Sequence, residues 1–154
     1  MTDPGVTTDP SAPRPSHLGI CVSDLDAALR FWCDGMGFTA AERYDLDSDT
    51  VPGLDRSLEA GGHVTVVSQF VRHGATAIEL LHYRDPEPHG TPSGSRAQLG
   101  YTHLAFQVDD LDAAVTRVVA AGGTLLEATR ASLGVELVFL ADPDGNRVEL
   151  LQMG

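Results

Sequence analysis

The chain contains the same short sequence twice, and this internal repeat limits its possible folds more than any other feature. Residues 17–29 (HLGICVSDLDAAL) and residues 103–115 (HLAFQVDDLDAAV) are identical at eight of thirteen positions. A shorter repeat follows later in each half, with IELL at residues 78–81 and VELL at residues 148–151. Two copies are too few for a solenoid, which needs about three stacked units. We therefore expect two similar modules that pack against each other.

Each repeat predicts a strand that leads into a helix. Alternating apolar residues open both copies, which is typical of a strand with one buried face. A capping-box pattern then marks the start of a helix, Ser23-x-x-Asp26 in the first copy and Asp109-x-x-Asp112 in the second. Three more strands are predicted in each half, at residues 38–43, 63–71, 76–83, 124–128, 134–140 and 146–152. The pattern predicts an α+β fold made of two βαβββ modules.

The repeats divide the chain into four segments. Residues 1–15 are rich in Pro, Thr and Asp and predict a disordered leader. The first module then spans residues 16–83, the second spans residues 101–154, and residues 84–100 form a linker rich in Pro, Gly and Ser. The opening His and the closing Glu are 62 positions apart in the first module and 46 in the second, and the 16 extra residues fit best at residues 45–62. Such an insertion is either a plain surface loop or a lid over a site.

Charge and composition exclude several classes of partner. The formal net charge is −12, and so acidic a surface repels nucleic acid and anionic lipid. No stretch approaches the roughly 18 consecutive apolar residues of a membrane span, and the N-terminus lacks the pattern of a secretory signal. Cys21 and Cys33 lack zinc-type spacing, so we expect free thiols in a reduced, cytoplasmic protein. Neither a nucleic acid nor a membrane is an expected partner.

Four polar residues recur at matching places in the two modules. His17 and His103 open the first strands, and Glu79 and Glu149 lie mid-strand among Ile, Val and Leu. Successive strand residues face opposite sides, so each Glu points away from the apolar face that packs on the helices. A buried carboxylate is costly unless it is paired, protonated or coordinated. A salt bridge would meet that need, but the duplication favours one shared divalent-metal site, with Zn, Ni, Co, Mn or Fe as candidate ions.

The two opening motifs and the closing motif DPDGNRVELLQ at residues 142–152 resemble those of the vicinal oxygen chelate superfamily. This family includes glyoxalase I, methylmalonyl-CoA epimerase, extradiol dioxygenases and bleomycin- or fosfomycin-resistance proteins. The resemblance covers residues 16–152 and implies an incomplete eight-stranded barrel around a metal cleft. It also implies a homodimer, with sites completed within one chain or between two. The family's ligand positions fall on four residues, namely His17, Glu79, His103 and Glu149.

Four protein ligands resemble the glyoxalase and epimerase branch of this family. The resemblance implies a lyase or isomerase that removes a proton next to a carbonyl group through a metal-stabilised enediolate. Glu149 is the expected base, and Glu79 is the other candidate. The substrate is then a small-molecule carbonyl compound or thioester. Cys21 and Tyr83 stand where bacterial glyoxalase I has Arg and Asn residues that contact glutathione, which argues against lactoylglutathione as the substrate.

Two other activities are open within the same family. A non-catalytic resistance protein would sequester a drug or natural product in the same cleft. An Fe(II) extradiol-type dioxygenase would bind its iron through His17, His103 and Glu149. Glu79 as a fourth ligand argues against that chemistry, because it occupies a position that O₂ or the substrate needs.

Other polar residues carry weaker signals. Cys21 shares the face of His17 and is a candidate extra ligand. Tyr101, Gln107 and Glu136 are candidates to line the cavity. The histidines without a counterpart in the second module are expected on the surface or in loops, and they are His63, His73, His82 and His89.

Overall fold

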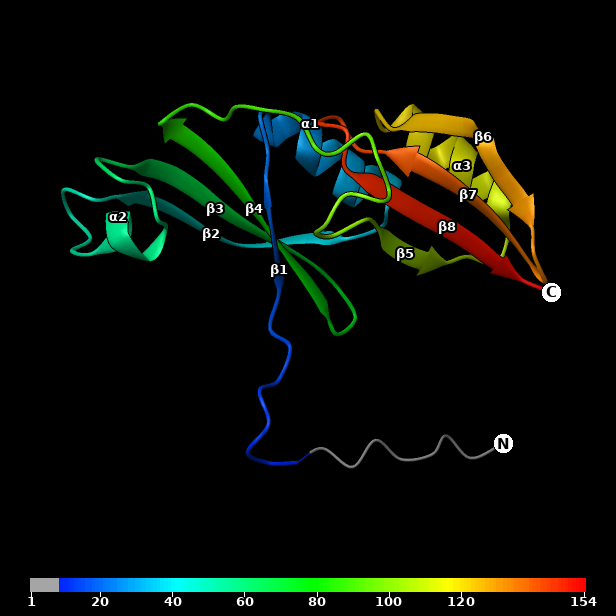
Figure 1. Cartoon of the computed structure of the whole chain (residues 1–154), viewed down its shortest axis with the longest axis horizontal. Coiled ribbons are helices and arrows are strands. Elements are labelled where there is room, and N and C mark those ends of the chain that lie inside the picture. Colours follow the sequence, from blue (N-terminus) through cyan, green and yellow to red (C-terminus); the bar gives the residue numbers. More distant parts are fainter. Residues whose placement is uncertain (1–8) are drawn as a thin grey trace.

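The structure, a computed structural model, describes residues 9–154. The leader expected at residues 1–15 therefore lies largely outside the described residues, which exclude residues 1–8. Residues 9–16 contain a turn but no strand or helix, and they run away from both sheets (Figure 1). Within residues 9–154, no helix has the length and hydrophobicity that crossing a membrane requires.

The first module contains four strands and three helical segments. They are β1 (Leu18–Cys21), α1 (Leu25–Leu29), the π-helical turn η1 (Arg30–Gly35), β2 (Thr39–Asp47), α2 (Leu54–Ser57), β3 (Thr65–His73) and β4 (Thr76–Asp85). The strands form one sheet in the order β1-β4-β3-β2. β1 runs parallel to β4, and the other neighbours are antiparallel.

The second module repeats this plan with fewer elements. They are β5 (Leu104–Gln107), α3 (Leu111–Ala120), β6 (Thr124–Ser132), β7 (Val135–Ala141) and β8 (Arg147–Met153). Its sheet has the order β5-β8-β7-β6, again with one parallel pair, β5 and β8. The predicted α+β fold of two βαβββ modules is confirmed. Within residues 9–154 of the single chain, the eight strands form two separate sheets and no closed barrel (Figure 1).

Both module helices begin one residue later than the capping-box pattern predicted. The N-cap residues are Asp24 and Asp110, whose backbones are extended with φ of −135° and −137°. Each carboxylate accepts a 2.9 Å hydrogen bond from the N–H three residues later. A charged carboxylate at this end also interacts favourably with the helix dipole. Ser23, the predicted cap, instead donates its backbone N–H and its hydroxyl to Asp144 and so joins the two modules.

One continuous hydrophobic core extends through both modules. It contains the alternate residues of the closing strands that face the helices, such as Ile78 in β4 and Val148 in β8. η1 packs closely on α3, and Gly35 permits this because a Cβ there would lie 3.0 Å from the Cβ of Ala121. The apolar alternation in the sequence therefore correctly identified the buried faces of the sheets.

The insertion of the first module forms the end of β2, α2 and a return loop. Figure 1 shows α2 at the outer end of the first sheet. Leu54 of α2 is the centre of a small second hydrophobic cluster, which includes Leu81 and Tyr83 of β4. Because these two residues lie two and four positions after Glu79, they share its face of the strand. The insertion therefore covers part of the sheet face that carries Glu79.

Candidate metal centre

In the first module, the start of β1 lies beside the middle of β4. Their parallel pairing sets Gly19 opposite Glu79, so His17, two residues before Gly19, lies on the same face. The His17 Nε2 atom is 3.2 Å from Glu79 Oε2. The ring has two further contacts, because Nδ1 lies 3.0 Å from the hydroxyl of Ser16 and the ring packs edge-on against Phe70.

The second module builds the same pair from the repeated sequence. The His103 Nε2 atom is 3.4 Å from Glu149 Oε2. Its Nδ1 lies 2.8 Å from the hydroxyl of Thr102, and its ring packs edge-on against Phe139. The ring centroids are 5.1 Å apart, compared with 5.2 Å in the first module. The sequence repeat therefore duplicates the local side-chain geometry as well as the fold.

Each pair fits one divalent cation. Because metal–nitrogen and metal–oxygen bonds are about 2.0–2.2 Å long, neighbouring ligand atoms on one ion lie about 3 Å apart. The observed separations of 3.2 and 3.4 Å are close to that value. A hydroxyl at Nδ1 also orients each imidazole with Nε2 toward the carboxylate, as outer contacts do for metal-binding histidines. Two imidazoles and two carboxylates form a donor set that suits Zn, Ni, Co, Mn or Fe.

The single chain brings the four residues together as two pairs and not as one group. The pairs lie on separate sheets. Among residues 9–154, a single group of three or more His, Cys, Asp or Glu side chains is close enough to hold one ion, and it contains none of the four. The histidine side chains are 37% and 33% exposed, so both pairs are accessible from outside the chain. Each module therefore presents half of the predicted ligand set.

A cavity of about 600 Å³ lies between the modules and reaches His103. β1, linker residues 88–92 and the starts of β5 and β8 surround it, and its size is typical of small-molecule sites. Cys21 lines it, and burial raises the pKa of this thiol, with a further contribution from the negative charge of Asp144. Trp32 also lines it, and its buried indole N–H has no hydrogen-bond partner among the described residues.

The residues predicted to line the cavity are only partly correct. Tyr101 does line it. Gln107 lies elsewhere, on the opposite end of β5, and Glu136 faces the other side of β7, where it accepts a hydrogen bond from Ser132. β5 and β7 are only four and seven residues long. Side chains from different strands therefore line the same cavity only where the strand register places them side by side.

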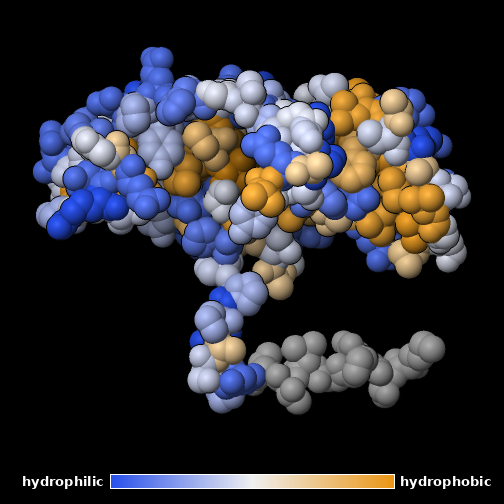
Figure 2. Space-filling model, viewed as in Figure 1, coloured by the Kyte–Doolittle hydropathy of each residue, from blue (hydrophilic) through white to orange (hydrophobic). Residues whose placement is uncertain are grey.

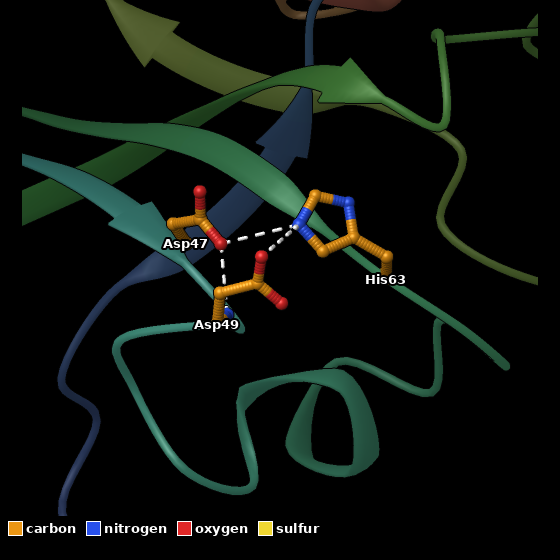
Figure 3. A group of neighbouring side chains, drawn as sticks. All are labelled: Asp47, Asp49 and His63. Carbon is orange, nitrogen blue, oxygen red and sulfur yellow. Dashed lines mark hydrogen bonds and ion pairs between the residues drawn. The ribbon is translucent and has the colours of Figure 1, made fainter.

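The sequence analysis did not identify a group of three polar side chains at the base of the insertion, which are Asp47, Asp49 and His63 (Figure 3). The His63 Nε2 atom lies 3.2 Å from Asp47 and 3.7 Å from Asp49, and Nδ1 lies 2.9 Å from Asp85. Hydrogen bonds with Asp85 and Asp47 raise the pKa of His63. These contacts tie the ends of β2 and β4 to the segment before β3. Only the path of the insertion brings the residues together, so no short motif predicts them.

Of the other three histidines without a counterpart in the second module, His73 and His89 lie on the surface as the sequence suggested, and the same expectation is wrong for His82. His73 is exposed at the end of β3, and His89 is exposed in the linker. His82 is half-buried in β4, where its Nδ1 lies 3.2 Å from the carbonyl oxygen of Val22. None of the three belongs to the ion-sized group found in residues 9–154.

Comparison with known proteins gives similarities over most of the chain. A family described as the Glyoxalase/Bleomycin resistance protein/Dioxygenase superfamily matches residues 14–150. A lactoylglutathione lyase from Neisseria meningitidis is 30% identical over 144 residues, which cover 88% of each chain. A 2-epi-5-epi-valiolone epimerase from an Actinomyces species is 30% identical and covers 99% of this chain and 85% of its own. A glyoxalase family protein from Bacillus cereus has a similar structure, with a TM-score of 0.78 and 22% identity over 95% of this chain and 98% of that one.

Proposed function

Because the chain belongs to the glyoxalase/bleomycin resistance protein/dioxygenase superfamily, we propose that it is a metal-dependent lyase or isomerase that moves a proton next to a carbonyl group. The observation that carries this proposal is the His–Glu pair, which occurs in both modules with matched geometry. Relatives named as a lyase and as an epimerase support an enzyme of this general kind.

We further propose that two copies of the chain complete each site. The His17–Glu79 pair of one copy then faces the His103–Glu149 pair of the other. The separation of the two pairs within one chain supports this arrangement, since the described residues do not gather them around one ion. Hydrophobic side chains also gather at the end of the second module in Figure 2. Leu133, in the turn between β6 and β7, is 76% exposed. Apolar surface of this kind favours a subunit contact, and a twofold dimer would contain two equivalent sites.

Within such a site, the residues have separate roles. A divalent cation bound by the four side chains supplies electrostatic stabilisation of negative charge on a carbonyl oxygen. Glu149 removes the proton from the adjacent carbon and returns it to the same or the neighbouring carbon. Its side chain is 15% exposed, which limits access of water to the carboxylate. Glu79 and the two histidines hold the ligand set in place.

The size of the cavity beside His103 supports the substrate class that we propose. A volume of about 600 Å³ accepts a small α-hydroxy carbonyl compound or a thioester. Cys21 lines this cavity and Tyr83 packs under the insertion, so neither position offers the cationic or amide side chain that glutathione recognition uses in the family. We therefore propose a substrate other than lactoylglutathione. The free thiols of Cys21 and Cys33 suit a protein that works in the reducing cytoplasm.

The experiment compares two mixed dimers that carry the same two substitutions in total. In the first, one copy has His17→Ala and the other has His103→Ala. In the second, one copy has both substitutions and the other is wild type. Differently tagged copies are co-expressed, the mixed dimers are isolated, and bound Co²⁺ is counted for each. Exchange of the α-proton of glyceraldehyde with D₂O, followed by NMR, measures the activity.

A site shared between copies leaves one intact site in the first mixed dimer and none in the second. We therefore expect Co²⁺ binding and proton exchange at about half the wild-type level in the first mixture only. Co²⁺ binding and proton exchange in the second mixed dimer only would show that each site lies within one chain. If the His17→Ala and His103→Ala homodimers both keep wild-type Co²⁺ binding and proton exchange, the proposed metal centre itself is refuted.

A further inference from the structure

The two glutamates of the proposed centre differ in what holds them. In the first module, the Ser68 hydroxyl donates a 2.5 Å hydrogen bond to Glu79 Oε1, while Glu79 Oε2 faces His17. Both oxygens of Glu79 therefore have a partner. Among residues 9–154, Glu149 has one side-chain partner, His103, which leaves its second oxygen without a donor.

The difference arises at one position of the sheet. Ser68 lies opposite Leu81 on the neighbouring strand, and the residue opposite the equivalent Leu151 is Leu137. Leucine offers no hydrogen bond to the carboxylate beside it. Ser68 is 1% exposed, and a buried hydroxyl requires a partner, which Glu79 provides. The contact therefore fixes the hydroxyl and the carboxylate at the same time.

We propose that Ser68 is a positioning residue that keeps Glu79 a fixed ligand and leaves Glu149 as the carboxylate that moves. This inference rests on the proposed function. A hydrogen bond to one oxygen of a ligating carboxylate orients the other oxygen toward the ion. Glu149 lacks such a donor, so its carboxylate can turn toward a substrate without losing a protein hydrogen bond. One hydroxyl thus separates the roles of two glutamates that occupy equivalent places in the fold.

The test measures the affinity of the full-length protein for Zn²⁺ and Co²⁺ by competition with a chelating dye. Ser68→Ala removes the donor and is expected to weaken both affinities by about 10- to 100-fold, the usual effect of losing an outer contact to a ligand. The Co²⁺ absorption bands should also change, because the carboxylate no longer has a fixed orientation at the ion. Ser68→Thr keeps the hydroxyl and is expected to bind like wild type. Ser68→Val has nearly the same shape as Ser68→Thr but lacks the hydroxyl, so it is expected to bind like Ser68→Ala.

Two further variants separate positioning from a general effect on the fold. If Ser68 acts through Glu79, Ser68→Ala causes no additional loss of affinity in a Glu79→Ala background. Leu137→Ser places a hydroxyl at the matched position of the second module, beside Glu149, so it adds a donor and is expected not to weaken Co²⁺ binding.

The outcomes distinguish this inference from the function on which it rests. Equal metal affinities and spectra for wild type, Ser68→Ala and Ser68→Val would overturn the role of Ser68 and leave the proposed metal centre intact. An additional loss in the Glu79→Ala background would also overturn it, because Ser68 would then act through the fold. A wild-type protein that binds neither ion would overturn the proposed function and this inference together.

Discussion

The insertion partly covers the sheet face that carries Glu79, whereas within residues 9–154 no insertion covers the matching face of the second sheet, which carries Glu149. Tyr83 packs in the hydrophobic cluster around α2, while Met153 at the corresponding place in β8 is 54% exposed. The ligand pairs have nevertheless kept almost the same separation, 3.2 Å in one module and 3.4 Å in the other. Binding one ion constrains distances between ligand atoms, and it leaves the rest of each face free to change.

The two modules therefore differ in how their apolar surface is covered. The first module covers apolar residues beside Glu79, such as Leu81 and Tyr83, with residues of its own insertion. The second leaves apolar residues such as Leu133 exposed, where a second copy can cover them. A duplicated fold can in this way keep one His–Glu pair in each half while the surroundings of the two pairs change.

The largest difference between the modules should appear in catalysis. Glu149→Gln is expected to slow α-proton exchange by about 10²- to 10⁴-fold, the usual contribution of a general base. Glu79→Gln should mainly weaken Co²⁺ binding, with exchange largely restored at saturating metal. NMR exchange rates in D₂O, measured over a range of Co²⁺ concentrations, compare the two variants. The reverse ranking would make Glu79 the base.

The cluster under the insertion and the exposed apolar surface of the second module should also differ in their contribution to stability. Leu54 is 8% exposed, and Leu54→Ala is expected to lower the free energy of unfolding by about 2 kcal/mol, near the low end for a core leucine because its cluster is small. Leu133→Ala in the second module is the matched control and should change the free energy of unfolding of the monomeric chain by less than about 0.5 kcal/mol, as surface substitutions do. Urea unfolding at a protein concentration that keeps the chain monomeric measures both values. A similar loss in both variants would mean that the monomeric chain itself buries Leu133.

The smallest effect concerns the His63 contacts that anchor the insertion. Because Asp85, Asp47 and Asp49 raise the pKa of His63, its contribution to stability is fully present below about pH 6.5, the ordinary histidine value. It is lost as the pH rises through the higher pKa of the folded protein. The melting-temperature difference between wild type and His63→Gln should therefore be larger at pH 5.5 than at pH 8.5. His73→Gln, at an exposed histidine of the same sheet, is the control, and a pH-independent difference for His63→Gln would contradict the assignment.

Repetition and alternation were sufficient to predict most of the fold. They identified both βαβββ modules and the buried faces, because period-two hydrophobicity reflects burial directly. They underestimated β6, which continues to Ser132 instead of residue 128. Most of the added residues are polar and exposed, and the strand rejoins β7 at Ala131 after a register shift that begins at Leu126. Such an irregularity depends on the partner strand and leaves no local signal.

The sequence could predict the members of each His–Glu pair, but not how each pair is held or how the two pairs are placed relative to each other. The matched residues His17 and His103 are apparent from the repeat alone. The Ser68–Glu79 hydrogen bond depends on the strand register, and the His63 group depends on the path of the insertion. Whether two pairs share one ion depends on how chains associate, which is a property of an assembly and not of one chain.

The matched His–Glu pairs also bear on the origin of the proposed dimeric centre. Each module contributes one imidazole and one carboxylate from equivalent strands. An ancestral half-length polypeptide that self-associated would have supplied the same four donors through symmetry alone. Gene duplication then had no need to invent the centre. On the roles proposed above, duplication would have allowed the two copies of a once identical residue pair to specialise, one for anchoring and one for chemistry.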